Sequence, residues 1–333
     1  MSSKILVTGG AGYIGSHVVR QLGEAGYDLV VLDDLSTGHD WAVLAGELVR
    51  GDLFDCELLD SLLGQHKFAA VLHFAARIVV PESVADPLKY YRNNTANTLN
   101  LIEACARHGI RRFVFSSTAA VYGIPDSDAV REDSPLLPIN PYGASKMMSE
   151  RMLMDYATAS DMRYVILRYF NVAGADPDGR IGQATPEATH LIKVACETAL
   201  GKRGKLQVFG NDYATADGTC IRDYIHVEDL ARAHLDALTY LSDGNASSQV
   251  LNCGYGHGYS VLDVINTVKK CSQTEFAVEV TGRRAGDSPA LIAVSDRIRD
   301  VLHWQPRHDD LDFIVRTAYE WEKILADRHG RKH

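Results

Sequence analysis

Short apolar runs alternate with longer amphipathic stretches through the first half of the chain. Residues 5–8, 29–32, 70–74 and 113–116 are apolar without the alternation of a half-exposed strand, which is typical of strands covered on both faces. Between them, apolar residues recur every three or four positions over 15–25, 87–108 and 141–160, and this spacing predicts helices. Repeated strand–helix units predict an α/β fold with a Rossmann-type, doubly wound parallel sheet.

The pattern changes after residue 167. Residues 171–187 are rich in Gly, Pro, Ala and Asp, which predicts a loop where the chain leaves the sheet. Helices are expected near 187–200 and 228–241, and the apolar run 250–253 is interpreted as a strand that returns to the sheet. We therefore predict a nucleotide-binding domain and a smaller mixed α/β C-terminal substrate lobe. The domain would comprise residues 1–171 and 228–253, and the lobe residues 172–227 and 254–333.

The composition is that of a globular protein, with 46% hydrophobic and 23% charged residues. The chain has 34 Lys and Arg against 43 Asp and Glu, so its formal charge is -9, and no basic stripe offsets it. A nucleic-acid partner is therefore not expected. The first residues lack an apolar segment of signal-peptide length, and no apolar run is long enough for a membrane span, so no membrane association is expected.

Six cysteines are scattered along the chain, and no two have the C-x-x-C spacing. This distribution argues against a zinc site and against a disulfide framework. The sequence thus predicts no metal and a reducing, cytoplasmic location.

A glycine-rich segment follows the first predicted strand and begins the first predicted helix. Gly9, Gly12 and Gly15 stand where free amides and the helix dipole can hold a pyrophosphate. Asp33 ends the second strand, 18 residues beyond Gly15, where a carboxylate can accept hydrogen bonds from an adenosine ribose. No Arg or Lys occurs from residue 21 to residue 49, which favours NAD over NADP. Asp52, after a third short strand, either lies near the adenine or is a turn carboxylate.

A tyrosine and a lysine with Y-x-x-x-K spacing occur twice. Tyr319 and Lys323 lie on a charged C-terminal helix and are interpreted as structural, whereas Tyr142 and Lys146 fall in the first turns of a helix expected to pack on the sheet. A neighbouring ammonium and a positive nicotinamide both favour the phenolate, so Tyr142 can act as a general base or acid. Thr118 ends the preceding strand and can share the same hydrogen bond.

With these motifs in order, the chain resembles the extended short-chain dehydrogenase/reductase family, and within it the UDP-glucose (UDP-galactose) 4-epimerases, over about residues 4 to 320. The segments that carry the resemblance include TGGAGYIGSH (8–17), FSSTAAVYG (115–123), PYGASK (141–146), RDYIHVEDLA (222–231) and RRAGDSPA (283–290). The last two are the more specific to nucleotide-sugar epimerases.

The resemblance implies a role for each matching residue. Tyr142 would be the catalytic base, with Lys146 and Thr118 beside it. The residues implied to line NAD are Gly9, Gly12, Tyr13, Ile14, Asp33, Asp52, Leu53, Phe74, Ala75, Asn93, Lys146 and Tyr169. Those implied to surround the UDP-sugar, besides Thr118 and Tyr142, are Asn171, His190, Leu191, Phe209, Arg222, Tyr224, Arg284 and Asp287.

Three further positions qualify the resemblance. Ile78 stands where many epimerases have a lysine, so no catalytic role is assigned there. Leu291 stands where members with a narrow substrate range tend to have a tyrosine, which predicts a roomier sugar pocket. His226, flanked by Ile225 and Val227, is interpreted as a structural residue beside the cleft.

The predicted reaction inverts C4 of a UDP-sugar through a transient 4-keto intermediate, with NAD bound throughout. Another UDP-sugar could be the substrate: a UDP-N-acetylhexosamine, a UDP-pentose or a UDP-uronate. Rival interpretations are a nucleotide-sugar dehydratase, a decarboxylase and a non-catalytic NAD sensor; the first two would need acidic residues where Ala119 and Ala120 follow Thr118. The resemblance also suggests a homodimer through the helices near 87–108 and 140–160.

Overall fold

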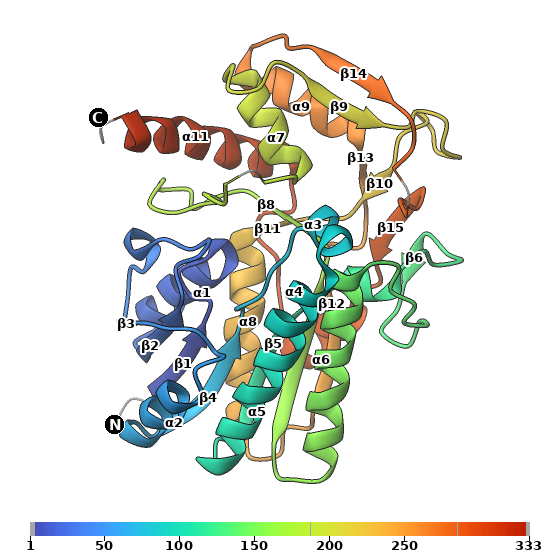
Figure 1. The fold of residues 1–333 in the computed structure, drawn as a ribbon. Coiled ribbons are helices and arrows are strands. Elements are labelled where there is room, and N and C mark those ends of the chain that lie inside the picture. Colours follow the sequence, from blue (N-terminus) through green and yellow to red (C-terminus); the bar gives the residue numbers. More distant parts are fainter. Residues whose placement is uncertain (1–3, 187, 285, 331–333) are drawn as a thin grey trace.

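The computed structural model describes residues 4–186, 188–284 and 286–330. Its centre is a seven-stranded parallel sheet with the strand order β12-β7-β5-β4-β1-β2-β3 (Figure 1). The order reverses direction between β1 and β4, where open α/β sheets bind ligands at the carboxyl ends of the strands. The strands are β1 (Lys4–Thr8), β2 (Asp28–Asp33), β3 (Glu47–Arg50), β4 (Phe68–His73), β5 (Arg112–Thr118), β7 (Arg163–Tyr169) and β12 (Gln249–Cys253).

Helices cover both faces of this sheet. On one face, α1 (Tyr13–Glu24) and α8 (Val227–Ser242) pack together over a buried aliphatic cluster. On the other face lie α2 (Cys56–Gln65), α5 (Asn97–Arg107) and α6 (Pro141–Thr158), with the short helices α3 (Val80–Ala85) and α4 (Pro87–Tyr90) beside α6. This arrangement confirms the predicted doubly wound parallel sheet.

The four strands predicted in the first half and the strand at 250–253 are all present. β12 pairs with β7, so the chain does return to the sheet after the second lobe begins. The helix predicted over 87–108 is divided, because a π-helical segment, Tyr91–Ala96, separates α4 from α5. The helix expected near 187–200 is present as α7 (Leu191–Ala199), and residue 187 lies outside the described residues. Residues 171–173, expected in a loop, instead form β8 (Asn171–Ala173).

A second layer of structure lies above the carboxyl ends of the strands (Figure 1). It contains α7, α9 (Val261–Ser272) and α11 (Leu311–Gly330), which pack on one another, and the parallel pair β9 (Leu206–Phe209) and β14 (Val278–Thr281). β8 pairs in parallel with β11 (Tyr224–His226) between the two layers.

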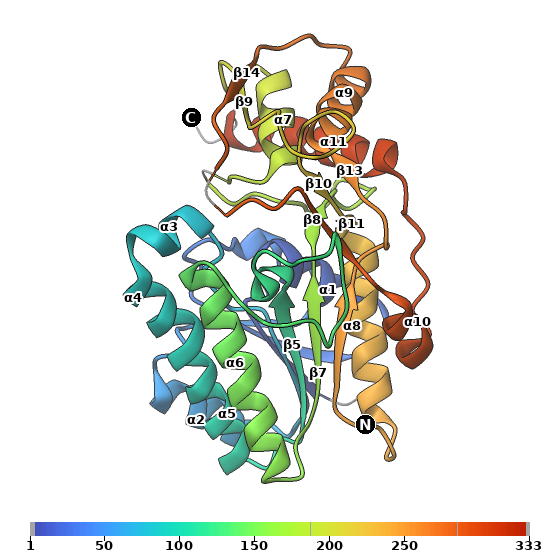
Figure 2. The same ribbon diagram turned by 90° about the vertical axis from the view of Figure 1, so that its right-hand side faces the viewer.

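Several segments cross between the layers. A small sheet combines β13 (Tyr259–Ser260), β10 (Ile221–Arg222) and β15 (Ala290–Ala293) with β6 (Ala129–Val130), which comes from the first half of the chain. In the opposite direction, α10 (Asp296–Leu302) packs against β12 and α8 beside the large sheet (Figure 2). The division of the chain at residues 171, 227 and 253 stays a prediction.

Candidate active site

The glycine loop lies at the carboxyl end of β1. Gly9 has a φ of +72°, and a side chain there would run into the backbone of Ala75 at the end of β4. Ala75 donates its amide to Thr8 O at 3.1 Å, which holds the two strand ends together. Gly12 caps α1 without a side chain, so the first-turn amides of Tyr13 and Ile14 are available to an anion. The loop therefore has the shape and the donors that a dinucleotide pyrophosphate requires.

Asp33 lies at the end of β2 and supports the same loop. Its carboxylate accepts hydrogen bonds from the Ala11 amide at 2.9 Å and from the Leu35 amide at 2.9 Å. Burial raises the pKa of Asp33, and these two amides oppose that effect. A small cavity beside the loop is lined by Gly12, Tyr13 and Ser16 from this side and by His39, Trp41 and Gly182 from the other, among further residues. These features fit an adenosine diphosphate half of NAD.

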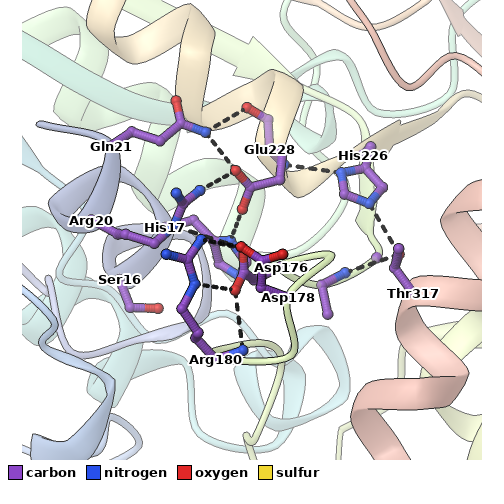
Figure 3. Close-up of polar contacts among 12 residues, drawn as sticks. Ser16, His17, Arg20, Gln21, Asp176, Asp178, Arg180, His226, Glu228 and Thr317 are labelled. Atoms are coloured by element: carbon purple, nitrogen blue, oxygen red, sulfur yellow. Dashed lines mark hydrogen bonds and ion pairs between the residues drawn. The ribbon is translucent and has the colours of Figure 1, made fainter. Parts of the chain in front are cut away.

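The helix that begins at the glycine loop is anchored by buried charges (Figure 3). Glu228, at the start of α8, accepts hydrogen bonds from His17 and Arg20, and from Gln21 at 2.7 Å. Burial disfavours its charge, but the contacts with His17 and Arg20 prevail and hold the pKa of Glu228 at about 2. His226 accepts the Glu228 amide at 3.1 Å and contacts Thr317 of α11 at 3.0 Å, a structural environment of the kind expected for it.

Tyr142 and Lys146 lie in the first two turns of α6. Asn140 caps this helix by accepting the Gly143 amide at 2.9 Å, and Pro141 occupies its first position. Lys146 is almost fully buried, with its ammonium nitrogen 4.5 Å from the centre of the Phe115 ring on β5. The helix start thus brings both side chains to the carboxyl edge of the sheet.

The pKa values at this pair differ from the expectation. Burial raises the pKa of Tyr142, and the hydrogen bond with Thr118 only partly opposes it. Burial also lowers the pKa of Lys146 to about 7, against the opposing charge of Glu150. The sequence predicted that the lysine would help to lower the pKa of the phenol; in the chain by itself, the cost of desolvation prevails. The positive charge of a bound oxidised cofactor would oppose this effect on Tyr142.

Other residues expected around NAD surround the same edge. Tyr169 at the end of β7 is hydrogen bonded to Ser116 of β5, and its ring packs edge-on against His234. Phe74, after β4, packs on the same histidine ring with centroids 4.7 Å apart. Asn93 lies in the π-helical segment, a distortion often found at functional sites.

Asp52 and Leu53 lie after β3, between the sheet and α5. The carboxylate of Asp52 accepts the Phe54 amide at 2.9 Å and the side-chain amide of Asn97 at 3.1 Å. These contacts hold the turn after β3 against α5, and Leu53 is buried. Their expected contact with the cofactor stays a prediction.

A cavity opens between the sheet and the upper layer. Four of the residues expected around the UDP-sugar line it: Asn171, His190, Leu191 and Tyr224. Asn171 and Tyr224 face each other across the β8–β11 pair. Asn171 follows Tyr169 by two residues, so the chain runs directly from the carboxyl edge of the sheet to this cavity.

The remaining predicted substrate residues form a second group. Asp287 is contacted by Arg284, whose Nε and Nη2 lie 3.1 and 3.0 Å from its two oxygens, and by Arg222 Nη2 at 3.5 Å. Arg284 also lies over the Phe209 ring, 5.3 Å from its centre. Two guanidinium groups that are far apart in the sequence thus converge, as a diphosphate would require.

The two positions that depart from the resemblance have different surroundings. Ile78 is partly exposed after β4. Leu291, on β15, pairs with Arg222 of β10 and packs on a buried cluster that includes Tyr122 and Phe170. It therefore lies next to one of the two converging arginines.

The described part of the chain contains no group of three His, Cys, Asp or Glu residues arranged to hold a metal ion. None of its helices combines the length and the apolar character that a membrane crossing needs.

A family model described as the NAD dependent epimerase/dehydratase family matches residues 5–254. The chain belongs to this family. Among curated relatives in it, the UDP-glucose 4-epimerase of Azospirillum brasilense is 58% identical over 331 residues, which cover 99% of this chain and 95% of that protein.

Solved structures of the family are similar throughout. The UDP-Glc/GlcNAc 4-epimerase of Campylobacter jejuni is 52% identical with a TM-score of 0.86, covering 97% of this chain and all of that one. The UDP-glucose 4-epimerase of Brucella ovis in complex with NAD is 44% identical with a TM-score of 0.93, covering 96% of this chain and 98% of that one.

Sequence reasoning missed several residues of this family member's site. Gln183, Lys193, Trp321 and Glu322 also line the cavity above the sheet. Trp41 and His39 line the cavity beside the glycine loop. They come from loops and from helices of the upper layer that carry no recognisable motif, so only the fold brings them to the site.

Proposed function

We propose that this member of the NAD dependent epimerase/dehydratase family inverts C4 of UDP-sugars and interconverts UDP-glucose and UDP-galactose. The observation that carries the proposal is the position of Tyr142 and Thr118 at the sheet edge that continues, through Tyr169 and Asn171, into the cavity. The chain thus passes from this edge to the cavity within two residues. The identity of relatives over nearly the full chain supports the same reaction.

Each group of residues has a part in the proposed reaction. The glycine loop and Asp33 would hold NAD, which when bound would supply the hydride acceptor and donor for sugar C4. The Tyr142 phenolate oxygen takes the proton of the 4-hydroxyl and returns it after the keto sugar has turned, while Thr118 keeps the tyrosine oriented. Arg222 and Arg284 hold the diphosphate. Loose contacts with the sugar are needed, because tight ones would prevent it from turning.

Incubation of the purified protein with UDP-galactose, without added NAD, tests this function. An epimerase that retains its cofactor forms UDP-glucose with no net oxidation. A dehydratase would form a 4-keto-6-deoxy sugar, a decarboxylase would act only on a UDP-uronate, and an NAD sensor would form no product. Absence of UDP-glucose, with the cofactor present in the protein, would reject the proposal.

We further propose that the sugar pocket accepts UDP-N-acetylhexosamines. Leu291 supports this, because its side chain is smaller than a tyrosine ring at a position beside Arg222. The Campylobacter jejuni relative named for both glucose and N-acetylglucosamine substrates is 52% identical to this chain. An assay of both UDP-N-acetylhexosamines would give turnover within about tenfold of that for UDP-galactose if the pocket has the required room.

The chain's surface and its cysteines support two proposals on its setting. Leu88, Leu99 and Met148 expose apolar side chains on α4, α5 and α6, the helices expected to form a homodimer. The six cysteines are all free, which suits a reducing compartment such as the cytoplasm.

A further inference from the structure

A buried ion pair lies behind the reactive tyrosine and lysine, and no step of the proposed reaction uses it. Glu150 on α6 and Arg168 on β7 are only 1% and 2% exposed. Arg168 donates from Nε to one carboxylate oxygen at 3.0 Å and from Nη2 to the other at 2.6 Å, and the Ser117 hydroxyl donates a further hydrogen bond. The carboxylate is therefore fixed in one orientation.

Glu150 is on α6, Arg168 is on β7 and their partner Ser117 is on β5, three elements that lie side by side in Figure 2. Tyr142, Lys146 and Glu150 follow at intervals of four residues along α6, so they lie one turn apart on one side of the helix. The pairing of β5 with β7 sets Ser117 beside Arg168, one residue before Thr118 and Tyr169. A shift of the ion pair would therefore move the phenol, the ammonium and both strand ends together.

Glu150 is also the charged group that favours the ammonium form of Lys146. Burial lowers the pKa of Lys146 to about 7, and the negative charge of Glu150 opposes this fall. From β4, His73 faces the lysine as a neutral ring, because burial and the lysine's own charge lower the pKa of His73 to about 3. β5 contributes the uncharged Phe115 ring.

The other titratable and charged neighbours of Lys146 are two residues on β7. Burial raises the pKa of Tyr169 on β7, so it stays a neutral phenol. Arg168, also on β7, reaches the lysine only through Glu150, to which it is bound. Its remaining Nη1 donates to the Tyr122 hydroxyl at 3.1 Å and to the Glu132 carbonyl at 3.0 Å.

We propose that Glu150, held by Arg168 and Ser117, is a positioning residue that keeps Lys146 as an ammonium beside Tyr142 and thereby favours the phenolate. Two forms of the pair hold the same number of protons: a neutral phenol with a neutral amine, and a phenolate with an ammonium. Glu150 is one helical turn from the lysine and two from the tyrosine, so its attraction for the ammonium exceeds its repulsion of the phenolate. The inference rests on the proposed function of Tyr142.

The variant Glu150→Gln keeps the shape of the side chain and removes its charge. In NAD-loaded protein, the phenolate absorption of Tyr142 is obtained by subtracting the spectrum of the same protein with Tyr142→Phe. We expect about tenfold less phenolate at neutral pH in Glu150→Gln, and a titration midpoint about one pH unit higher. The kcat for UDP-galactose should fall by the same factor, with KM unchanged within about twofold.

The double variant Glu150→Gln/Arg168→Met distinguishes charge from packing. Because it also removes the unpaired cation that the single variant leaves, its phenolate population should rise above that of the single variant but stay about threefold below that of the wild type. It carries the test alone if the single variant fails to fold. The control Asp155→Asn breaks the solvent-exposed pair with Arg151 on the same helix and should change neither phenolate nor kcat.

Two results would overturn the inference: an unchanged phenolate titration in Glu150→Gln, or a double variant further from the wild type than the single one. For the double variant alone, a phenolate population equal to that of the wild type would be the contrary result. Since the titration needs no sugar, it is independent of the UDP-galactose assay. A wild-type protein that shows the titration but no epimerisation would reject the proposed function and leave the role of Glu150 intact.

Discussion

Burial of Tyr142 has two opposing effects on its reactivity. Burial in the site keeps water away from the reacting atoms, but it also raises the pKa of the phenol. Burial has the reverse effect on Lys146, whose pKa falls to about 7. Both shifts favour uncharged side chains in the chain alone. The reactive phenolate is therefore expected only when a bound cation and Glu150 act together on the pair.

Replacement of Tyr142 by Phe removes the proton-transfer group and keeps the ring. We expect kcat for UDP-galactose to fall about a hundred- to ten-thousandfold, while the Kd for UDP, measured by calorimetry, stays within about twofold of the wild type. Tyr319→Phe is the matched control, because this tyrosine has the same spacing to a lysine but lies on α11. An equal loss of activity in both variants would remove Tyr142 from the mechanism.

At the scale of elements, α1 depends on ions that it shares with α8. His17, Arg20 and Gln21 all point from α1 to Glu228, and Asp176 and Arg180 continue the charge cluster into the loop after β8 (Figure 3). Removing one partner of a buried pair leaves an uncompensated charge, which costs more than the pair contributes. These contacts therefore hold α1, and with it the glycine loop at its start, against α8.

Glu228→Gln should lower the free energy of unfolding by about 3–5 kcal/mol at neutral pH, because Arg20 loses its buried counter-charge. The folded-state pKa of Glu228 is lowered from an ordinary 4.5 to about 2, so its contribution is fully present above pH 4.5 and is lost as the pH falls towards 2. Urea unfolding of both proteins between pH 3 and pH 7 measures this. A difference in stability that grows as the pH falls would contradict the assignment.

The elements that could be predicted from sequence are those whose signal is local. Strands buried on both faces appear as continuous apolar runs, and the glycine loop and the Tyr142–Lys146 spacing each lie within one short segment. β8 was missed because it depends on pairing with β11, whose residues are more than fifty positions away. The π-helical segment depends on Asn94, which bonds the backbone of Arg77 and the Ser145 hydroxyl.

In the site, too, only residues with a local sequence signal could be predicted. Glu150 carries a local signal, since it follows Lys146 by four residues, as Lys146 follows Tyr142. Its partner Arg168 lies 18 residues away, and only the register of β5 and β7 brings it beside Ser117. The pKa of Tyr142 depends on burial by residues of several elements, which no motif records.

At the scale of the molecule, the helices on one face of the sheet remain partly uncovered. Figure 1 shows α4, α5 and α6 side by side on this face, and Leu88 on α4 is 71% exposed. Leu99 and Met148 on the neighbouring helices are 41% and 42% exposed. A second copy of the chain seated here would press α6, which carries Tyr142, against the sheet.

The variant Leu88→Glu tests this dimer. A two-fold interface contains the substituted position of both subunits, so two buried carboxylates without partners would oppose association.

We expect light scattering to show about 73 kDa for the wild type, twice the chain mass of 36.6 kDa, and a monomer for the variant. The variant should also unfold at a lower temperature and have lower activity, as Tyr142 loses support from behind α6. Val280→Glu, at an exposed apolar position on β14 in the upper layer, should remain dimeric. A monomeric wild type, or a dimeric Leu88→Glu protein, would place no subunit contact on these helices.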